Sequence, residues 1–173
     1  MRALRVGLTG SIGAGKSEAL RAFAAAGAET LSADAVAHEL SRRGGPVAKA
    51  AARALGPRAL AEDGSLDRPG VAAAGFRDPA ARRRHEDATH PLISKELERR
   101  LARSRRPVAV VDAPLLFVAG LRDRFDLTVC VSAPAAVRLA RAARRDRAAR
   151  ADVARRDRAQ WPQARKQSLS DVV

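Results

Sequence analysis

Short apolar runs alternate with alanine-rich stretches along this chain of 173 residues. Four of the runs contain β-branched residues, which is typical of buried strands, and they cover residues 4–8, 28–31, 108–112 and 127–131. The stretches between them have helical patterns. Because strands buried on both faces form continuous apolar runs, we predict an α/β fold in which helices flank a parallel sheet. Asp112 would end the central strand, at the edge where such sheets bind ligands.

Residues 37–106 separate the second and third predicted strands and contain several helical patterns without a convincing strand. Glycine and proline mark turns in this region, at Gly44-Gly45-Pro46, Gly56-Pro57, Asp63-Gly64 and Arg68-Pro69-Gly70. We therefore predict a single domain over residues 1–173. Its core would comprise residues 1–36 and 107–173, with an inserted helical lobe over residues 37–106.

The turn after the first predicted strand fits the phosphate-binding motif G-x-x-x-x-G-K-[ST]. Glycines allow several backbone N–H groups to converge on a polyphosphate, and a helix beginning near Gly15 adds its positive N-terminal end. Lys16 would reach the β and γ phosphates, and the Ser17 hydroxyl would help to hold Mg²⁺ with ATP. The alternative, a tight turn with an incidental Lys-Ser, gives the glycines no purpose. The residues expected to bind the nucleotide are Gly10, Gly13, Ala14, Gly15, Lys16, Ser17 and Glu18.

The composition indicates the cellular compartment of the protein. No apolar stretch approaches the roughly 18 residues that span a bilayer, and no signal-peptide pattern precedes the first strand, so we expect a cytoplasmic protein without a membrane partner. The single Cys130 excludes an internal disulfide and lies in an apolar run, which predicts a buried thiol in a reducing compartment.

The net charge of +14 raises the question of a nucleic-acid partner. Residues 138–166 carry eleven basic and three acidic residues, so the charge is concentrated late in the chain. Only four of the 33 basic residues are lysine, a bias that a GC-rich genome produces without a partner. With four Phe, one Trp and no Tyr, the chain offers few rings to stack on bases, so we expect nucleic acid not to be the main partner.

Several segments, taken in chain order, together resemble the dephospho-CoA kinase family over nearly the whole chain. They are residues 8–17, Ser32-Ala33-Asp34-Ala35-Val36-Ala37-His38, Asp63-Gly64-Ser65-Leu66-Asp67-Arg68, Phe76-Arg77-Asp78-Pro79, His90-Pro91-Leu92-Ile93, Asp112-Ala113-Pro114-Leu115-Leu116-Phe117 and the arginines 138, 141 and 145. The resemblance implies a P-loop NTPase-type three-layer fold whose helical lobe recognises the phosphate acceptor. It also implies transfer of the γ-phosphoryl group of ATP to the 3′-hydroxyl of dephospho-CoA ribose, with Mg²⁺, to give coenzyme A and ADP.

Asp34 follows the second predicted strand and should therefore face the phosphate loop. We expect Asp34 to orient and deprotonate the acceptor hydroxyl. The other two residues expected to be catalytic are Lys16, which would hold the donor phosphates, and Arg141. An alternative, compatible with catalysis, is that Asp34 caps a helix beginning at Ala35.

Arg141 and Arg145 are four residues apart and would share a helix face in a lid over residues 138–160. Spacing alone favours a solvated arginine face, with Arg138 and Arg144 as neighbours. The family pattern instead implies that Arg141 meets the γ-phosphate and, less firmly, that Arg145 binds the nucleotide.

The pair His90-Pro91 predicts a loop or a helix boundary, because proline disfavours helical geometry in the residue before it. The resemblance assigns this pair to substrate binding, together with Pro114 and Leu115. Asp112 stays open between a role behind Mg²⁺ and a turn before Pro114. Three scattered histidines and one cysteine provide no transition-metal ligand set.

The chain departs from the family pattern where Ser32 replaces an aspartate, Val118 a glutamate and Arg138 a glutamine. It also ends before the family's last strand and helix, which predicts an open sheet edge and lower stability. Either the shortened chain still folds, or its activity is impaired. Two alternative functions remain. One is another P-loop kinase acting on a nucleoside or a sugar, and the other is a non-catalytic nucleotide-binding or nucleic-acid-associated module.

Overall fold

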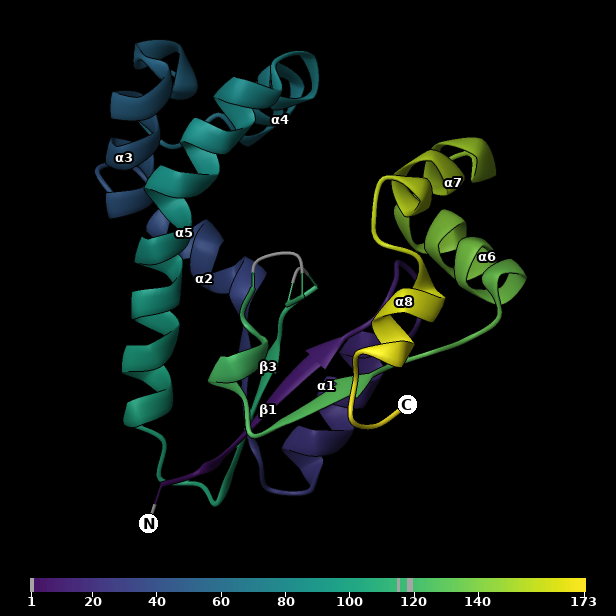
Figure 1. The fold of residues 1–173 in the computed structure, drawn as a ribbon. Helices are drawn as coiled ribbons and strands as arrows, with labels where there is room; N and C mark the ends of the chain where they lie inside the picture. The colour runs from purple at the N-terminus through teal and green to yellow at the C-terminus, as the bar shows by residue number, and fades with distance from the viewer. Residues whose placement is uncertain (1, 115, 118–119) are drawn as a thin grey trace. The chain divides into compact units, whose positions relative to one another are not determined.

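The computed structural model describes residues 2–114, 116–117 and 120–173 (Figure 1). Two compact units are present. Met1–Ser32 and Ser104–Val173 form the first unit, and Ala33–Arg103 form the second.

Four parallel strands form the sheet of the first unit. They are β1 (Leu4–Thr9), β2 (Glu29–Ser32), β3 (Val108–Asp112) and β4 (Leu127–Cys130), arranged in the order β2-β3-β1-β4. The predicted α/β class with a parallel sheet is confirmed. The third strand has its predicted bounds, whereas β2 begins and ends one residue later than its apolar run, a difference that is common at element ends.

The register aligns the carboxyl ends of the strands. Leu8 of β1 pairs with Asp112 of β3 and with Val129 of β4, and Asp112 also pairs with Ser32 of β2. The chain leaves β1 toward β2 at one edge and later reaches β4 on the other side of β1. Such a reversal of strand order opens a ligand crevice beyond the carboxyl ends, directly at the turn that follows β1.

Apolar side chains cover both faces of β1. On one face, Val6, Leu8 and Val110 form a buried cluster against Leu20 and Phe23 of α1 (Lys16–Ala25). On the other face lies Gly7, where a Cβ would stand 2.9 Å from the Phe125 ring and would also collide with Leu116. The strand β1 is therefore buried from Val6 to Thr9, as its apolar run indicates, whereas Leu4 at its amino end is 46% exposed.

The C-terminal part of the first unit is helical until it returns to the sheet. After β4 come α6 (Ala135–Asp146), α7 (Arg150–Arg158) and α8 (Gln163–Ser168), whereas the short helix η2 (Arg122–Arg124) lies between β3 and β4. After α8, Asp171 accepts hydrogen bonds from the backbone and hydroxyl of Thr128, both at 2.7 Å, and two from Arg122 at 2.9 Å. The carbonyl of Val172 accepts from Cys130 N at 2.8 Å, beside an isolated parallel bridge to Val129.

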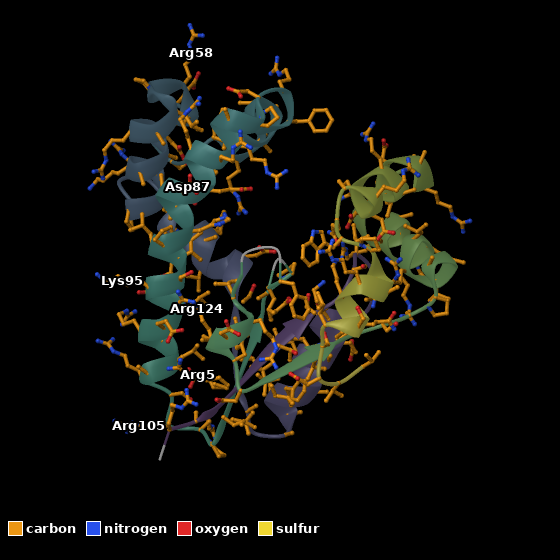
Figure 2. The ribbon with its side chains drawn as sticks, in the orientation of Figure 1. Arg5, Arg58, Asp87, Lys95, Arg105 and Arg124 are labelled. Carbon is orange, nitrogen blue, oxygen red and sulfur yellow. The ribbon has the colours of Figure 1, made fainter. Side chains whose placement is uncertain are left out.

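The second unit consists of α2 (Ala33–Leu40), α3 (Pro46–Leu55), η1 (Pro57–Ala59), α4 (Arg68–Arg77) and α5 (Pro79–Ala102). Helix α5 contacts α2, α3 and α4, as Figure 1 shows, and buries Leu97 and Leu101. The described residues of this unit contain no strand, only an isolated antiparallel bridge between Leu60 and Leu66. Cations such as Lys95 project outward from its helices (Figure 2).

The prediction of a loop or helix boundary at His90-Pro91 is wrong, because both residues lie inside α5. Pro91 has no N–H to donate to the carbonyl of Asp87, and an interior proline costs a helix about 3 kcal/mol. The helix nevertheless continues, because α5 packs against α2, α3 and α4 and buries Thr89 in the turn before Pro91. Within the helix, the Thr89 hydroxyl donates to His85 O at 2.7 Å. Tertiary contacts along α5 therefore outweigh the local preference. Among the described residues, no helix has both the length and the apolar composition of a membrane span.

Candidate functional site

The turn between β1 and α1 has the backbone geometry of a phosphate-binding loop. Gly10, Gly13 and Gly15 all have positive φ, at 149°, 72° and 105°, which side chains strongly disfavour. Ala14, which is buried, donates its N–H to Ser11 O at 3.1 Å. Gly15 is the N-cap of α1 and no side chain caps that end. In the first turn of α1, Glu18 donates its N–H to Gly15 O at 3.0 Å, and the N–H groups of Lys16 and Ser17 would point from the uncapped end toward a bound anion.

The three polar residues that follow Gly15 differ in their surroundings. Lys16 is half-buried and donates from Nζ to the carbonyl of Gly10 at 3.1 Å, so its ammonium lies over the loop. Ser17 is exposed on the first turn of α1. Glu18 is also exposed and forms an ion pair with Arg21. Lys16 and Ser17 thus lie where a nucleotide's phosphates and their cation would need them, whereas Glu18 is paired along the helix.

Side chains from distant helices hold this loop, and sequence reasoning missed them. Gln163 of α8 accepts from the backbone N–H of Ser11 at 2.9 Å and donates to Val131 O at 3.1 Å. Arg138 of α6 donates from Nη1 to the carbonyl of Ile12 at 3.1 Å. The loop is therefore anchored from two C-terminal helices as well as from β1.

Lys166 of α8 is a second lysine near the loop. It is only 3% exposed, and its Nζ lies 3.1 Å from Gln160 Oε1 and 3.4 Å from Ser11 Oγ. Burial lowers the pKa of Lys166, and repulsion from Lys16 lowers it further. The available sequence signal was weak: Gln163 and Lys166 are three residues apart and so share a helix face.

The carboxyl end of β3 borders the same edge of the sheet. Asp112 is half-buried and in register with Leu8, two residues before the phosphate loop begins. Ala113 donates its N–H to Leu8 O at 2.9 Å, which carries the pairing one residue further, and Pro114 follows. The predicted substrate-binding residue Leu115, and the departure at Val118, lie outside the described residues.

The arginines of α6 have unlike environments. Arg141 and Arg144 are exposed, and Arg145 is exposed but pairs with Asp146 at 2.7 Å, a hydrogen bond that raises the pKa of Arg145. Arg138 is 4% exposed, so the solvated arginine face suggested by spacing is wrong for this residue. Its guanidinium is buried because Asp157 and the loop carbonyl accept its hydrogen bonds.

Asp34, His90 and Pro91 belong to the second unit. Helix α2 begins at Ala33, directly after β2, and not at Ala35. Asp34 therefore lies in the first helical turn rather than at the N-cap, where its carboxylate still favours the positive end of α2. Asp34 is exposed, and His90 is half-buried on α5.

The second unit also contains a pocket of about 410 Å³ that the sequence did not reveal. Apolar side chains line it beside two guanidinium groups and His85, and one wall is Phe76, which is 90% exposed. Burial lowers the pKa of His85, and the charge of His90 lowers it further. The lining includes Leu55, Leu66, Arg68, Val71, Arg82 and Glu86. Within the lining, Arg82 pairs with Glu86 at 2.8 Å, so the pocket combines apolar walls with a partly neutralised polar side.

The part of the chain that the structure describes contains no group of three or more His, Cys, Asp or Glu side chains able to hold a metal ion. The exposed hydroxyl of Ser17 beside Lys16 instead fits a cation that takes most of its ligands from phosphate oxygens and water. Mg²⁺ is commonly bound in that way, through one or two protein groups.

Comparison with known proteins identifies the family of this chain. The family described as dephospho-CoA kinase matches residues 4–173. The chain belongs to the dephospho-CoA kinase family. It is 43% identical over 142 residues to a dephospho-CoA kinase of Methylococcus capsulatus, which covers 82% of this chain and 72% of that protein. A second dephospho-CoA kinase, from Anaeromyxobacter dehalogenans, is 40% identical over 171 residues, covering 97% of this chain and 81% of that protein.

Solved structures share the fold. A crystal structure of TT1252 from Thermus thermophilus matches all of this chain and 88% of its own, with a TM-score of 0.90 and 31% identity. Dephospho-CoA kinase from Campylobacter jejuni covers 98% of this chain and 86% of its own at a TM-score of 0.66 and 24% identity, which supports the fold alone. The family resemblance seen in the sequence is confirmed, and with it an ATP-dependent phosphotransferase that acts on dephospho-CoA.

Proposed function

We propose that this chain binds ATP on the loop of residues 10–17 and transfers the γ-phosphoryl group to the 3′-hydroxyl of dephospho-CoA ribose. The observation that carries the proposal is the loop itself. Three glycines with positive φ lead into an uncapped helix N-terminus, and Lys16 lies over the loop at the carbonyl of Gly10. This arrangement occurs in a member of a kinase family.

On ATP binding, Lys16 would exchange the Gly10 carbonyl for the β and γ phosphates. The exchange is favourable because the phosphates carry full negative charge, which attracts the ammonium more strongly than the dipole of the carbonyl does. The loop N–H groups and the N-terminal end of α1 would neutralise further charge. Lys166 Nζ lies 3.4 Å from Ser11 Oγ, so this second ammonium would stand beside the loop that holds the phosphates. Burial and then repulsion from Lys16 lower the pKa of Lys166, and a bound phosphate would oppose that shift.

Ser17 would hold Mg²⁺ together with the phosphate oxygens, and Asp112 would face the cation from the neighbouring strand. The register supports this pairing, because Asp112 lies opposite Leu8 at the carboxyl edge from which the loop begins. When bound, Mg²⁺ neutralises the charge that develops between the β and γ phosphates.

Asp34 would accept the proton of the 3′-hydroxyl as its oxygen attacks the γ-phosphorus. A new oxygen–phosphorus bond forms, the bond between the γ-phosphorus and its bridging oxygen breaks, and ADP leaves. The exposed carboxylate in the first turn of α2 supports this role, because no described ion pair occupies it. His90 and Pro91 would contact the acceptor from α5, and the pocket beside Arg68 and Arg82 would take its remaining length.

Arg141 would stabilise the charge on the transferred phosphoryl group. It is exposed, and the described residues include no ion-pair partner for it. Arg145 would first have to leave Asp146, so a nucleotide contact from Arg145 carries a cost that Arg141 avoids. Because the reaction consumes ATP, we infer that the enzyme works in the cytoplasm.

A coupled ADP-release assay tests the proposal. The purified chain should release ADP with dephospho-CoA and not with adenosine, gluconate or duplex DNA, and phosphorus NMR of the product should show a 3′-phosphomonoester. Stimulation by adenosine or gluconate would indicate a different small-molecule kinase. Stimulation by duplex DNA alone would overturn the proposal in favour of a nucleic-acid-associated ATPase.

A further inference from the structure

Arg138 is a buried cation at the point where the phosphate loop meets the C-terminal helices. Its side chain is 5% exposed and pairs with Asp157 of α7, with Nη1 at 2.7 Å from Oδ1 and Nη2 at 3.2 Å from Oδ2. The same Nη1 donates to the carbonyl of Ile12 at 3.1 Å. One guanidinium therefore joins the loop, α6 and α7.

The backbone of the loop also lies close to the backbone of α6. A Cβ on Gly13 would lie 2.8 Å from the carbonyl carbon of Arg138 and nearer still to its oxygen. The apex of the loop thus rests directly on the first turns of α6. Any shift of α6 moves the Ile12-Gly13 backbone with it, and so changes the N–H groups that would meet the phosphates.

A buried ion pair is a poor device for stability, since well-packed apolar residues often serve as well or better. What a bidentate pair does provide is a fixed geometry, because the planar guanidinium must match both carboxylate oxygens at once. The Nε of Arg138 is buried and has no hydrogen-bond partner among the described residues. Burying the pair therefore costs free energy, and its effect is to fix the position of the loop relative to α6.

We propose that Arg138 and Asp157 are positioning residues that hold the phosphate loop and α6 in one arrangement, and thereby set the affinity for ATP. Arg141 lies three residues after Arg138 on the same helix, so the pair also determines where α6 presents it. This inference rests on the proposed function, because it assumes that the loop binds ATP.

An effect of charge and an effect of position would change the ATP affinity of Asp157→Asn in opposite directions. Removing a carboxylate near the loop makes the site more positive, so attraction alone would tighten ATP binding. If the pair instead positions the loop and α6, its loss would weaken ATP binding. A matched control is Asp152→Asn on the same helix, which removes the same charge from an exposed pair with Arg155 at 3.1 Å.

The experiment measures the Kd for ATP by calorimetry and the KM for each substrate, on folded full-length chain well below its melting temperature. We expect Asp157→Asn to raise the Kd for ATP about tenfold, the size of one lost charge-assisted hydrogen bond. Asp152→Asn should leave it within twofold. The charge-neutral double variant R138M/D157M should melt at or above the parent temperature, yet also bind ATP about tenfold more weakly. The KM for dephospho-CoA should not change.

Arg138→Gln keeps a donor for the Ile12 carbonyl but removes the ion pair. Its Kd for ATP should lie between that of the parent and that of the double variant. Parent-like or tighter ATP binding by both Asp157→Asn and R138M/D157M would overturn the inference, as would an equal rise in the two KM values. Failure of the parent chain to bind ATP or to phosphorylate dephospho-CoA would instead overturn the proposed function.

Discussion

Gly13→Ala separates the requirements of the phosphate loop from ordinary backbone strain. Gly13 has φ of 72°, and its Cα faces the carbonyl of Arg138. An alanine there would carry the left-handed penalty of about 1–2 kcal/mol. It would also place a methyl group 2.8 Å from the Arg138 carbonyl carbon, well inside the separation that carbon atoms tolerate. The loop would have to move by about 1 Å to relieve that contact.

Such a movement should misalign the loop N–H groups. Losing two charge-assisted hydrogen bonds to phosphate costs about 3 kcal/mol or more, which corresponds to an increase of at least about a hundredfold in the Kd for ATP. Calorimetric titration with ATP measures that change. Circular dichroism should still report a folded chain, because the sheet core does not include Gly13.

Gly27→Ala is the matched control. Gly27 also has a positive φ, of 88°, but a Cβ there meets nothing within 4 Å, and the residue follows the opposite end of α1. It should lose the same 1–2 kcal/mol, a drop of about 2–4 °C in melting temperature for each kcal/mol, with ATP binding unchanged. Parent-like ATP binding by Gly13→Ala, or an equal loss in Gly27→Ala, would refute the reasoning.

Three further predictions concern single side chains. Lys16→Ala should abolish turnover and raise the Kd for ATP at least tenfold, since the loop loses its charged phosphate ligand; ADP release and calorimetry measure both. Asp34→Asn should lower kcat at least a hundredfold while leaving the Kd for ATP within twofold, and a collapse of ATP binding would show that its role is misassigned. The pKa of Glu96 is lowered to about 2 by hydrogen bonds from Arg99 and then from Arg100, so its stabilising effect is complete above about pH 4.5 and fades as the pH falls toward 2. Glu96→Gln should therefore reduce the unfolding free energy by about 1 kcal/mol at pH 7, a value discounted because the arginines are exposed to solvent. The reduction should become progressively smaller at pH 4 and pH 3. A reduction at pH 3 equal to that at pH 7 would contradict this account.

Local signals in the sequence were enough for the parallel sheet and for the phosphate loop. Continuous apolar runs indicate buried parallel strands, and three glycines at fixed spacing before Lys-Ser indicate a loop that needs positive φ. The observed φ values of Gly10, Gly13 and Gly15 follow from that spacing. These features depend on neighbours within a few residues, so they can be recognised in a single sequence.

Other features lie beyond local patterns. Proline at position 91 argues for a boundary, yet packing of α5 against three helices of its unit carries the helix through it. The arginine-rich stretch argues for a solvated face, yet Arg138 is buried because Asp157, 19 residues away, meets its guanidinium. In both cases tertiary contacts overruled a correct local preference.

The amino-acid sequence by itself determined the fold class, the phosphate loop and the family. Each of these is encoded in short segments and in their order along the chain, which can be recognised without knowing the tertiary contacts. Only the tertiary structure decided which residues support the loop. Arg138 reaches Ile12 across 126 positions and Lys166 reaches Ser11 across 155, and the partners of a buried charge cannot be chosen until the chain has folded. Burial makes those partners obligatory, since a charge removed from water must be paired or hydrogen-bonded.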